Sequence, residues 1–325
     1  MIDLESFFKH QLSHWETANN NYKRLDEVLY RTIEFDGFSI KIQCNPDRII
    51  SATARIDKQS LLSRPCFLCK EHLPDAQDSV SYNENFDIRI NPFPIFTPHF
   101  TVPAKRHVPQ LLENYLQDML SMAKDFPDYT VFYNGPRSGA SAPDHLHFQL
   151  APRHLMPLEN DVVNCSKETI LPAFLTSQEE IGSIASPTTF KIESITRYIR
   201  KNLILRTGDE KLMLIAFQYL LTEIGKVTPN APEPMFNLFV WYENEEWWVV
   251  LFPRQKHRPW QFFEEGKERI LFSPGCVDFA GLVISPRRED FERLDAPLLS
   301  DLFGQLTLSD NQWNNLIRYI EYPNL

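Results

Sequence analysis

The pattern of apolar and polar positions predicts a chain of alternating helices and short strands. Over residues 2–28, apolar side chains recur at helical spacing, which predicts a helix on the surface of the core. Residues 29–35 and 37–43 are expected to form a hairpin that turns at Asp36-Gly37, because this dipeptide favours tight two-residue turns. A further helix is predicted from about 110 to 124, where the apolar residues form one stripe.

The most informative pattern lies between Tyr133 and Leu150, after a predicted strand at 129–133. Polar and apolar residues alternate at its end, where His145, His147 and Gln149 are interleaved with Leu146, Phe148 and Leu150. Because successive side chains of a strand point to opposite faces, this order predicts a strand with one polar and one apolar face. Short strands at 86–90 and 98–104 precede it. The whole order predicts an α+β fold around a mostly antiparallel sheet.

The second part of the chain is expected to begin after an irregular stretch at 151–190 with scattered Pro, Ser and Thr. Helices are predicted at about 192–204 and 209–226, followed by a hairpin of 235–242 and 246–252. A last helix begins after Ser309, which forms a capping box with Gln312. We therefore divide the chain into an N-terminal helical segment, a first half, an irregular linker and a second half, at 1–28, 29–155, 156–190 and 191–325.

Two short stretches of the chain resemble each other. Residues 103–109 (PAKRHVP) and 253–259 (PRQKHRP) both follow a β-rich segment, and both end in basic residues, His, one residue and Pro. A similarity this short also arises by chance. An internal repeat and a chance match are therefore equally supported by these residues alone.

Composition and charge narrow the class of protein. With 43% hydrophobic and 23% charged residues among 325, the chain is expected to be soluble and globular, with two domains or two similar halves. The net charge of −10 argues against a nucleic-acid partner, whose phosphates attract Lys and Arg. No apolar run approaches the ~20 residues that cross a bilayer, so we expect no membrane partner. Five cysteines, an odd number, and an N-terminus unlike a signal peptide predict a cytoplasmic protein.

The residues before the predicted His strand have the composition of an anion-binding loop. Gly135 and Gly139 allow sharp backbone turns, and Arg137, Ser138 and Ser141 add a charge and two hydroxyl groups. An imidazole beside such a loop can attack phosphorus and carry a nucleotidyl group covalently. The pattern alone leaves two other interpretations open, a metal-ligand pair and a structural pair of histidines.

Cys66 and Cys69 form a Cys-x-x-Cys motif that suits two thiolates on one tetrahedral metal ion. A redox pair is the competing interpretation, although no βαβ pattern of a thioredoxin-like fold surrounds the motif. Further ligands would come from histidines elsewhere in the chain, and spacing alone does not choose among His72, His99, His107 and His145.

Basic residues of the second half lie near predicted strand ends and near a loop at 273–281, namely Arg254, Lys256, Arg287 and Arg288. At such positions basic residues either meet phosphate or, more often, form a solvated rim. We therefore assign no substrate role to them from the sequence.

The segment from Tyr133 to Gln149 resembles the active-site segment of the histidine triad superfamily, in its transferase branch. That branch contains diadenosine tetraphosphate phosphorylases (ATP adenylyltransferases), galactose-1-phosphate uridylyltransferases and GDP-hexose phosphorylases. Its His-x-His-x-Gln signature is met by His145, His147 and Gln149. The Gly-x-x-Ser-Gly-Ala-Ser loop at 135–141 is most similar to that of the diadenosine tetraphosphate phosphorylases.

This resemblance implies a HIT-like fold of two related halves, each with a mostly antiparallel sheet flanked by helices, of which the second lacks the catalytic motif. It implies that His147 is the nucleophile of a nucleotidyl-histidine intermediate and that Gln149 hydrogen-bonds the transferred phosphoryl group. A carboxamide cannot pass protons as a third imidazole could, which favours transfer over hydrolysis. The phosphate and nucleotide contacts are expected from Asn134, Gly135, Arg137, Ser138, Gly139, Ala140 and Ser141, together with Asn91 and Phe93.

The run from Cys66 to Cys69 (CFLC) is similar to the zinc-binding motif of the galactose-1-phosphate uridylyltransferases. Carried over by position, the two remaining ligands are His107 and His145, which implies a structural Zn²⁺ held by four protein ligands. Leu146 stands where those enzymes have a proline, and their second metal site has no obvious counterpart here. A Cys-x-x-Cys zinc site is not expected of the yeast-type phosphorylases, so the chain lies between these subfamilies.

The resemblance therefore predicts a nucleotidyltransferase or phosphorylase that acts on a dinucleoside polyphosphate or a nucleoside diphosphate sugar, with a phosphate or sugar phosphate as acceptor. The alternatives are a hexose-1-phosphate uridylyltransferase-type enzyme and a nucleotide-binding protein that has lost turnover. Because the two halves can pack against each other as protomers do in small histidine triad dimers, we expect a monomer or a homodimer.

Overall fold

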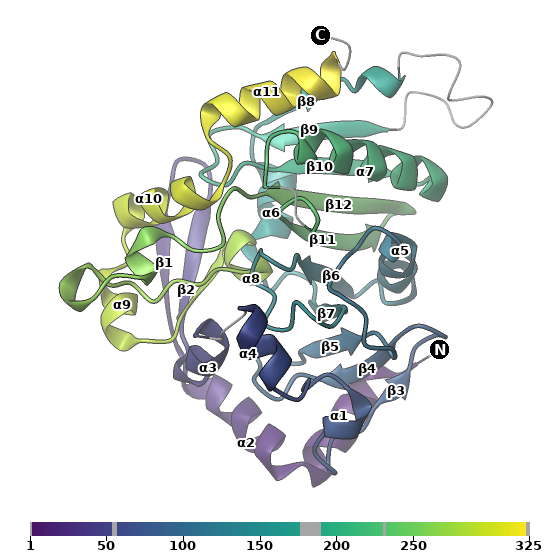
Figure 1. Cartoon of the computed structure of the whole chain (residues 1–325), viewed down its shortest axis with the longest axis vertical. Helices are drawn as coiled ribbons and strands as arrows, with labels where there is room; N and C mark the ends of the chain where they lie inside the picture. The colour runs from purple at the N-terminus through teal and green to yellow at the C-terminus, as the bar shows by residue number, and fades with distance from the viewer. Residues whose placement is uncertain (1, 54–56, 176–189, 230–231, 323–325) are drawn as a thin grey trace.

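The computed structural model describes residues 2–53, 57–175, 190–229 and 232–322. Within these residues the central feature is a ten-stranded antiparallel sheet in the order β3-β4-β5-β7-β6-β11-β12-β10-β9-β8 (Figure 1). The strands are β3 (Val80–Ser81), β4 (Asp87–Ile90), β5 (Phe100–Pro103), β6 (Tyr129–Asn134), β7 (His147–Pro152), β8 (Lys167–Ile170), β9 (Lys191–Ile195), β10 (Leu203–Thr207), β11 (Phe236–Glu243) and β12 (Glu246–Pro253). The predicted α+β fold is confirmed.

The two halves of this sheet have the same topology. Counted outward from the central β6–β11 pair, the order is β6, β7, β5, β4, β3 on one side and β11, β12, β10, β9, β8 on the other. Helix α5 (Leu116–Asp125) precedes β6, and α7 (Glu210–Gly225) precedes β11. The similar stretches 103–109 and 253–259 follow β5 and β12, which are not equivalent in this arrangement. Their similarity therefore does not follow the symmetry of the sheet.

One face of the ten-stranded sheet carries a core that is covered by helices. The helices that contribute to this first core are α1 (Leu4–His14), α2 (Glu16–Arg24), α5, α7 and α11 (Asp310–Glu321). Leu146, Phe148 and Leu150 also belong to it. Because side chains alternate along β7, His147 and Gln149 face the opposite side of the sheet.

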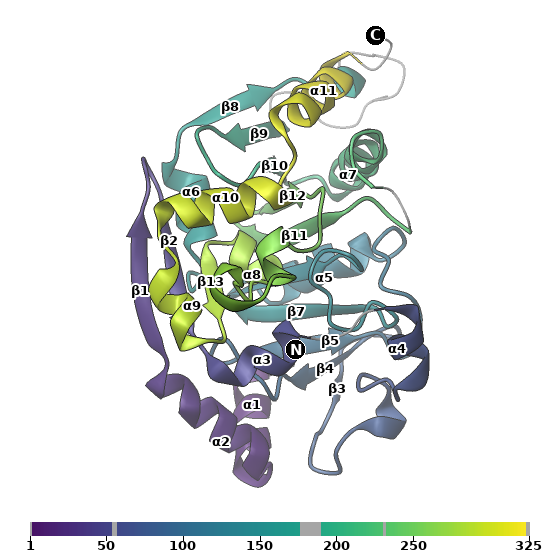
Figure 2. The ribbon, with the colours of Figure 1, turned by 60° about the vertical axis from the view of Figure 1, so that its left-hand side comes forward.

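The opposite face carries a second core, which a small three-stranded sheet and further helices cover. The small sheet is β1 (Leu29–Glu34), β2 (Ser39–Cys44) and β13 (Leu282–Ser285), and the helices are α6 (Pro157–Asn164), α8 (Cys276–Phe279), α9 (Arg288–Arg293) and α10 (Ala296–Leu306). Figure 2 shows β1 and β2 along one side of the molecule, near α9 and α10. Strand β13 pairs in parallel with β2. The N-terminal hairpin therefore forms one sheet with a strand from the second half of the chain.

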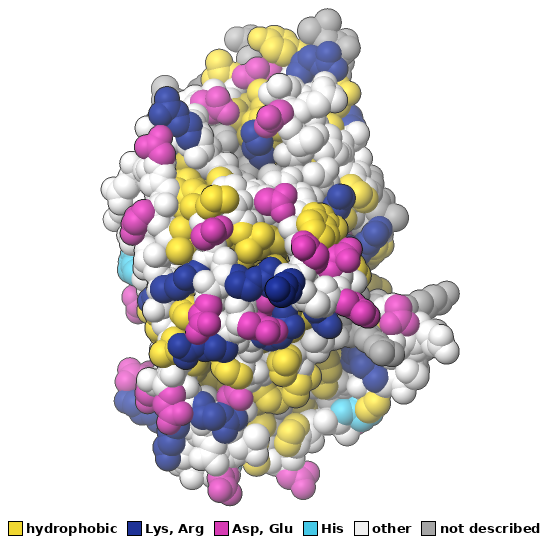
Figure 3. Space-filling view, turned by 90° about the vertical axis from the view of Figure 1, so that its left-hand side faces the viewer, with side chains coloured by type: hydrophobic (Ala, Val, Ile, Leu, Met, Phe, Trp, Pro, Cys, Tyr) yellow, Lys and Arg dark blue, Asp and Glu magenta, His cyan; other side chains and the backbone are white. Residues whose placement is uncertain are grey.

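Short elements connect these layers. They are α3 (Ile49–Ala52), α4 (Lys58–Ser63) and the 3₁₀ turns η1 (Leu25–Glu27), η2 (Pro46–Arg48), η3 (Lys70–His72), η4 (Ala173–Leu175), η5 (Trp260–Phe262) and η6 (Gly266–Glu268). None of the helices in the described part of the chain is long and apolar enough to cross a membrane. On the face shown in Figure 3, Lys and Arg side chains are interspersed with Asp and Glu.

Several predicted elements are confirmed. The hairpin at Asp36-Gly37 forms with a φ of +89° at Gly37, and α7 and the β11–β12 hairpin occupy the predicted ranges. Helix α11 has its capping box, in which the Ser309 and Gln312 side chains bond each other's backbone amides. These elements carry strong local signals, a turn dipeptide, a long apolar period or a cap.

The helix predicted at 192–204 is wrong, because this segment forms β9 and β10. Its apolar residues include the β-branched Ile192, Ile195 and Ile204, which fit a pleated surface, and pairing with β12 completes the sheet. The stretch 156–190 is not irregular throughout, since α6 begins with Pro157 and β8 pairs with β9. Residues 176–189 of that stretch lie outside the described residues.

Three boundaries also differ. The helix predicted over 2–28 is interrupted at Trp15, whose backbone is not helical and whose side chain is buried in the first core. The helix predicted from 110 begins only at Leu116. The strand predicted from 145 begins at His147, while His145 lies in a turn in which its N–H donates to the Ala142 carbonyl at 3.2 Å.

Candidate active site

His147 is the first residue of β7 and its side chain is held in one tautomer. The Nδ1 atom lies 2.8 Å from the carbonyl oxygen of His145. A carbonyl only accepts hydrogen bonds, so Nδ1 carries the proton and the lone pair is on Nε2. Burial lowers the pKa of His147 to about 4, so the ring is neutral at pH 7. The side chain therefore presents an unprotonated Nε2 in a fixed orientation.

The backbone of His147 is held by the side chain of Gln110. The β6–β7 register ends at Phe132↔Gln149, and continuing it by two pairs places Asn134 opposite His147. Between these two residues lies the Gln110 amide. Its oxygen accepts the His147 N–H at 2.8 Å, and its nitrogen donates to the carbonyls of Asn134 at 2.9 Å and His147 at 3.1 Å. Gln110 thus holds β6 and β7 apart where the Gly/Ser loop begins.

Gln110 is in turn anchored by residues of both halves. The Tyr133 hydroxyl lies 3.0 Å from the Gln110 carbonyl and 2.5 Å from Glu233 Oε1, and Glu233 Oε2 accepts the Leu112 N–H at 3.1 Å. Burial raises the pKa of Glu233 to about 7. Sequence reasoning missed Gln110 and Glu233, because their roles depend on pairing between distant segments and neither belongs to a local motif.

Gln149 is oriented by His99. The backbone N–H of Ile95 points to His99 Nδ1 at 3.3 Å, so His99 carries its proton on Nε2 and donates to Gln149 Oε1 at 3.0 Å. Burial, with a smaller contribution from the nearby positive charge of Arg48, lowers the pKa of His99 to about 3. The amide oxygen of Gln149 is thus occupied, and its NH₂ group is left as the donor beside His147.

The Gly/Ser loop, defined as residues 135–141, rests on the segment Pro274–Cys276 of the second half. At Gly139, where φ is +101°, a Cβ atom would lie 2.5 Å from the Gly275 Cα. The Asn134 side-chain oxygen accepts from the Cys276 N–H at 2.6 Å and from Asn237 Nδ2 at 2.8 Å. The glycine at 139 therefore allows close packing as well as a turn.

Several donors of the Gly/Ser loop are not used within the described residues. Gly135 N–H donates to Phe236 O and Ser138 N–H to Gly135 O, so these two amides are engaged. Among the described residues, the amides of Arg137, Gly139, Ala140 and Ser141 donate no hydrogen bond. The Ser138 hydroxyl is buried and has no partner among them. Free backbone amides beside an unpaired buried hydroxyl group are what an anion-binding loop provides.

Arg254 supports the Gly/Ser loop through Asn237 and Pro274. Its guanidinium is fully buried and donates to Asn237 Oδ1 at 3.1 Å and to the Pro274 carbonyl at 2.8 Å. Asn237 Nδ2 donates in turn to the Ser138 carbonyl at 2.6 Å. Arg254 is thus an internal anchor and is neither part of a solvated rim nor free to meet phosphate.

Asn91 and Phe93 lie near His99 and so near Gln149. The Asn91 N–H donates to the His99 carbonyl at 2.8 Å, and the Phe93 carbonyl accepts from Arg48 Nη1 at 2.6 Å. The Phe93 side chain is exposed. Arg48, which the sequence did not single out, brings a positive charge to this part of the site. These residues are brought together with Gln149 through His99.

Cys66, Cys69, His107 and His145 converge, with one possible ligand atom of each within 4.8 Å of the others. The Cys66 and Cys69 sulfurs lie 3.3 and 3.5 Å from His145 Nδ1, and Cys69 Sγ lies 3.2 Å from His107 Nδ1. His145 Nε2 donates to the Ala104 carbonyl at 2.8 Å, which leaves Nδ1 free to face the sulfurs. This Cys/His cluster could hold a metal ion.

The other histidine candidates lie outside the Cys/His cluster. His99 is paired with Gln149, and His72 Nδ1 lies 3.0 Å from the Cys66 carbonyl. Burial and the neighbouring Cys66 raise the pKa of the Cys69 thiol to about 12 without a cation. Because His145 is the residue whose carbonyl orients His147, the Cys/His cluster and the candidate nucleophile are directly connected.

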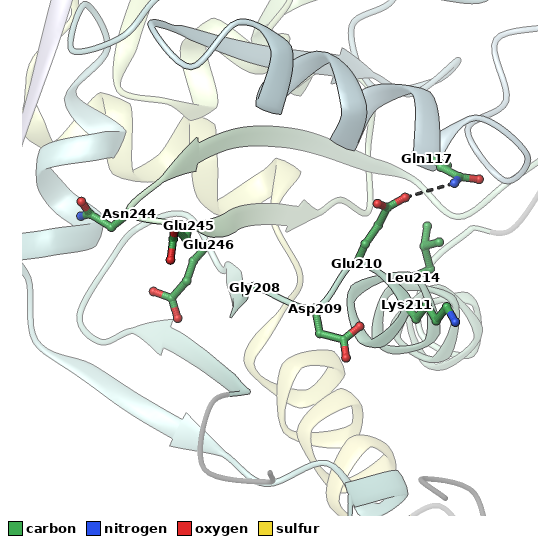
Figure 4. A pocket seen from close by; sticks show the side chains of 9 residues that line it. All are labelled: Gln117, Gly208, Asp209, Glu210, Lys211, Leu214, Asn244, Glu245 and Glu246. Carbon is green, nitrogen blue, oxygen red and sulfur yellow. Dashed lines mark hydrogen bonds between the residues drawn. The ribbon is translucent and has the colours of Figure 1, made fainter. Parts of the chain in front are cut away.

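A separate pocket of about 920 Å³ lies at the β10–α7 and β11–β12 connections (Figure 4). Gln117 of α5 donates to Glu210 at its edge, and Asp209, Glu245 and Glu246 add further acidic side chains. None of the predicted site residues lines it. The candidate catalytic residues lie elsewhere, around β7.

Comparison with known proteins identifies the class of fold. Residues 7–152 match a family model described as a domain of unknown function (DUF4922), and residues 176–321 match the model of the GDPGP1-like, C-terminal domain. The fold is shared with solved structures of a dinucleoside polyphosphate phosphorylase, so the fold that the resemblance implied is confirmed.

Solved structures that are similar over most of the chain include those of yeast Ap4A phosphorylase Apa2. One is 16% identical, covers 90% of this chain and 93% of that chain, and has a TM-score of 0.54. The complex with Ap4A is 15% identical, covers 90% and 96%, and has a TM-score of 0.56. The complex with AMP is 16% identical with a TM-score of 0.53, covering 92% and 96%. No curated protein matches the chain in sequence.

Proposed function

We propose that the chain is a nucleotidyltransferase that works by double displacement through a covalent adduct on His147 Nε2. The observation that carries the proposal is the state of this imidazole. Its Nδ1–H donates to the His145 carbonyl, and burial lowers its pKa to about 4, so Nε2 keeps its lone pair at neutral pH. A neutral, oriented imidazole is the form that attacks phosphorus.

Each half of the reaction exchanges one bond at phosphorus. In the first, Nε2 attacks, the N–P bond forms, and the P–O bond to the leaving phosphate group breaks. The ring then carries a positive charge, which the hydrogen bond from Nδ1–H to the His145 carbonyl stabilises. In the second, an oxygen of the acceptor phosphate attacks, the N–P bond breaks, and the neutral imidazole is restored.

The groups around His147 supply donors for the transferred phosphoryl group. The Gln149 NH₂ lies on the same face of β7 as His147, and its orientation is fixed by His99. The free amides and the Ser138 hydroxyl of the Gly/Ser loop add further donors, and Arg137 adds a positive charge. Such donors stabilise negative charge on the phosphoryl oxygens as bonds to phosphorus change.

The substrate that we propose is a dinucleoside polyphosphate or a nucleoside diphosphate sugar, with phosphate or a sugar phosphate as acceptor. The similarity to yeast Ap4A phosphorylase, which has been solved with Ap4A and with AMP, supports the first class. The match of residues 176–321 to the GDPGP1-like, C-terminal domain also supports this proposal. Asn91, Phe93 and Arg48 are the residues that we assign to nucleotide contact.

Adduct formation tests this function. Incubation with adenine, guanine and uracil dinucleotides and nucleotide sugars should leave an acid-labile mass addition on His147, detected by mass spectrometry of the peptide. His147→Asn should lose it, whereas His154→Asn, which changes an exposed histidine away from the site, should keep it. No adduct and no nucleotide exchange with any of these compounds would refute the proposal.

The metal that we propose for the Cys/His cluster is a structural Zn²⁺. Two thiolates and two imidazoles match the ligands of such sites, and four protein ligands leave no open position for substrate. Protein dialysed against metal-free buffer should retain about one Zn per chain by elemental analysis. Cys66→Ser should lose it and Cys44→Ser, a buried cysteine outside the cluster, should not. A metal-free chain that is folded and fully active would exclude a structural zinc.

A further inference from the structure

A second group of potential metal ligands lies on the N-terminal helix, away from β7. His10 and His14 are four residues apart on α1, so both side chains project from one face of the helix. Asp78, from the segment between η3 and β3, approaches the same face. Its Oδ2 atom lies 3.0 Å from His14 Nε2 and 3.6 Å from His10 Nε2. These three ligand atoms all lie within 4.8 Å of one another.

The tautomer of His14 directs a lone pair at the Asp78 carboxylate. His14 Nδ1 lies 2.8 Å from the His10 carbonyl oxygen, so it carries a proton, and a neutral ring has its lone pair on Nε2. A lone pair and a carboxylate oxygen 3.0 Å apart repel each other unless a positive centre lies between them. The hydrogen bond from Nδ1 to a carbonyl is also the contact that typically orients a metal-bound histidine.

Gln11 holds Asp78 in place, but its side-chain amide does not supply a full hydrogen bond to every nearby acceptor. The Gln11 side chain is fully buried, and its oxygen accepts the Asp78 N–H at 3.0 Å. Its amide nitrogen lies 3.2 Å from Ala76 O and 3.0 Å from both Asp78 Oδ2 and His14 Nε2. Two amide hydrogens cannot satisfy three acceptors in full. The ligands are therefore positioned in advance, and one more positive centre fits among them.

We propose that His10, His14 and Asp78 bind a second divalent transition-metal ion, with Zn²⁺ as the ion of best fit. Imidazole and carboxylate are zinc ligands at about 2.0–2.2 Å. Ligand atoms on a tetrahedron of that size lie roughly 3.3–3.6 Å apart, close to the observed 3.0 and 3.6 Å. Three protein ligands leave a fourth position for water. The ion joins α1 to the segment that leads back to Cys69, and the site shares no residue with the Cys/His cluster.

Zinc bound at this site can be measured separately from zinc bound at the Cys/His cluster. The full-length chain is first dialysed against metal-free buffer and then equilibrated with micromolar Zn²⁺, and bound zinc is measured by elemental analysis. The parent should take up one Zn per chain more than the double variant His10→Asn/His14→Asn. The control His154→Asn should bind as the parent does, and Cys66→Ser should lose only the zinc that survives dialysis. Equal uptake by parent and double variant would overturn the proposal.

Asp78→Asn separates ligation from scaffolding, because it keeps the backbone N–H that bonds Gln11 and removes one ligand charge. Loss of a residue that hydrogen-bonds a metal ligand weakens metal binding by about 10- to 100-fold. Loss of a ligand itself should weaken binding at least that much. In hydrogen exchange, added Zn²⁺ should slow exchange of α1 and of residues 76–78 in the parent but not in Asp78→Asn. Slowing in both proteins, or in neither, would contradict zinc ligation by this carboxylate.

Discussion

The β6–β7 and β11–β12 hairpins occupy equivalent positions in the two halves of the sheet, yet they close differently. The second pairs along its whole length, from Phe236↔Pro253 to Glu243↔Glu246, and turns through two residues with positive φ, Asn244 and Glu245. The first pairs only from Tyr129↔Pro152 to Phe132↔Gln149, and residues 135–146 join its strands. The candidate active site thus lies where one of two equivalent hairpins is opened.

The closed hairpin and the segments around it support the open one. Asn237 of β11 and Arg254, just after β12, hold the Gly/Ser loop from below, and Gly275 packs against it. Glu233, just before β11, holds Tyr133 at the end of β6. The two halves have the same topology but different roles. The half that lacks a counterpart of His147 supports the half that contains it.

The largest effect is expected where the open hairpin meets its scaffold, at Gly139. In Gly139→Ala the new Cβ would lie 2.5 Å from the Gly275 Cα, at a φ of +101°. Overpacking and backbone strain together should lower the free energy of unfolding by roughly 4 kcal/mol. Gly266→Ala is the matched control, since its φ is +59° and nothing lies within 4 Å, so strain alone should cost about 1 kcal/mol. Equal losses in denaturant titrations would show that the loop does not need this close packing.

The sequence predicted the open hairpin better than its support. The alternation from His145 to Leu150 and the Gly/Ser loop are local signals, and the chemistry assigned to His147 and Gln149 depends on them. Gln110, His99 and Glu233 act through contacts 37, 50 and 100 positions away in the chain, which no local pattern encodes. The same limit explains the error at 192–204, where pairing with β12 decided between helix and strand.

A smaller effect is expected from Gln110, which holds the open hairpin apart. Gln110→Ala removes the three hydrogen bonds that its side chain makes to Asn134 and His147, so the His147 backbone is less well positioned. We expect adduct formation in a single turnover to slow about tenfold, equivalent to ~1.4 kcal/mol, with little change in nucleotide affinity. Gln117→Ala, at the edge of the separate pocket, is the control and should leave the rate unchanged. A loss of stability without a slower rate would mean that Gln110 has no positioning role.

The smallest effect concerns pH and Glu233, which links the two hairpins. Burial raises the pKa of its carboxyl to about 7 from 4.5, so the folded protein holds this proton where the unfolded chain has released it. The resulting stabilisation is complete below the unfolded pKa and is lost as pH rises through about 7. Between pH 6 and 7.5 the parent should lose about 1 kcal/mol of unfolding free energy relative to Glu233→Gln, which cannot titrate. If the unfolding free energies of the two proteins change in parallel between pH 6 and 7.5, the Glu233 carboxyl does not titrate in this range. Its charge in the contact with Tyr133 would then be the same at both pH values.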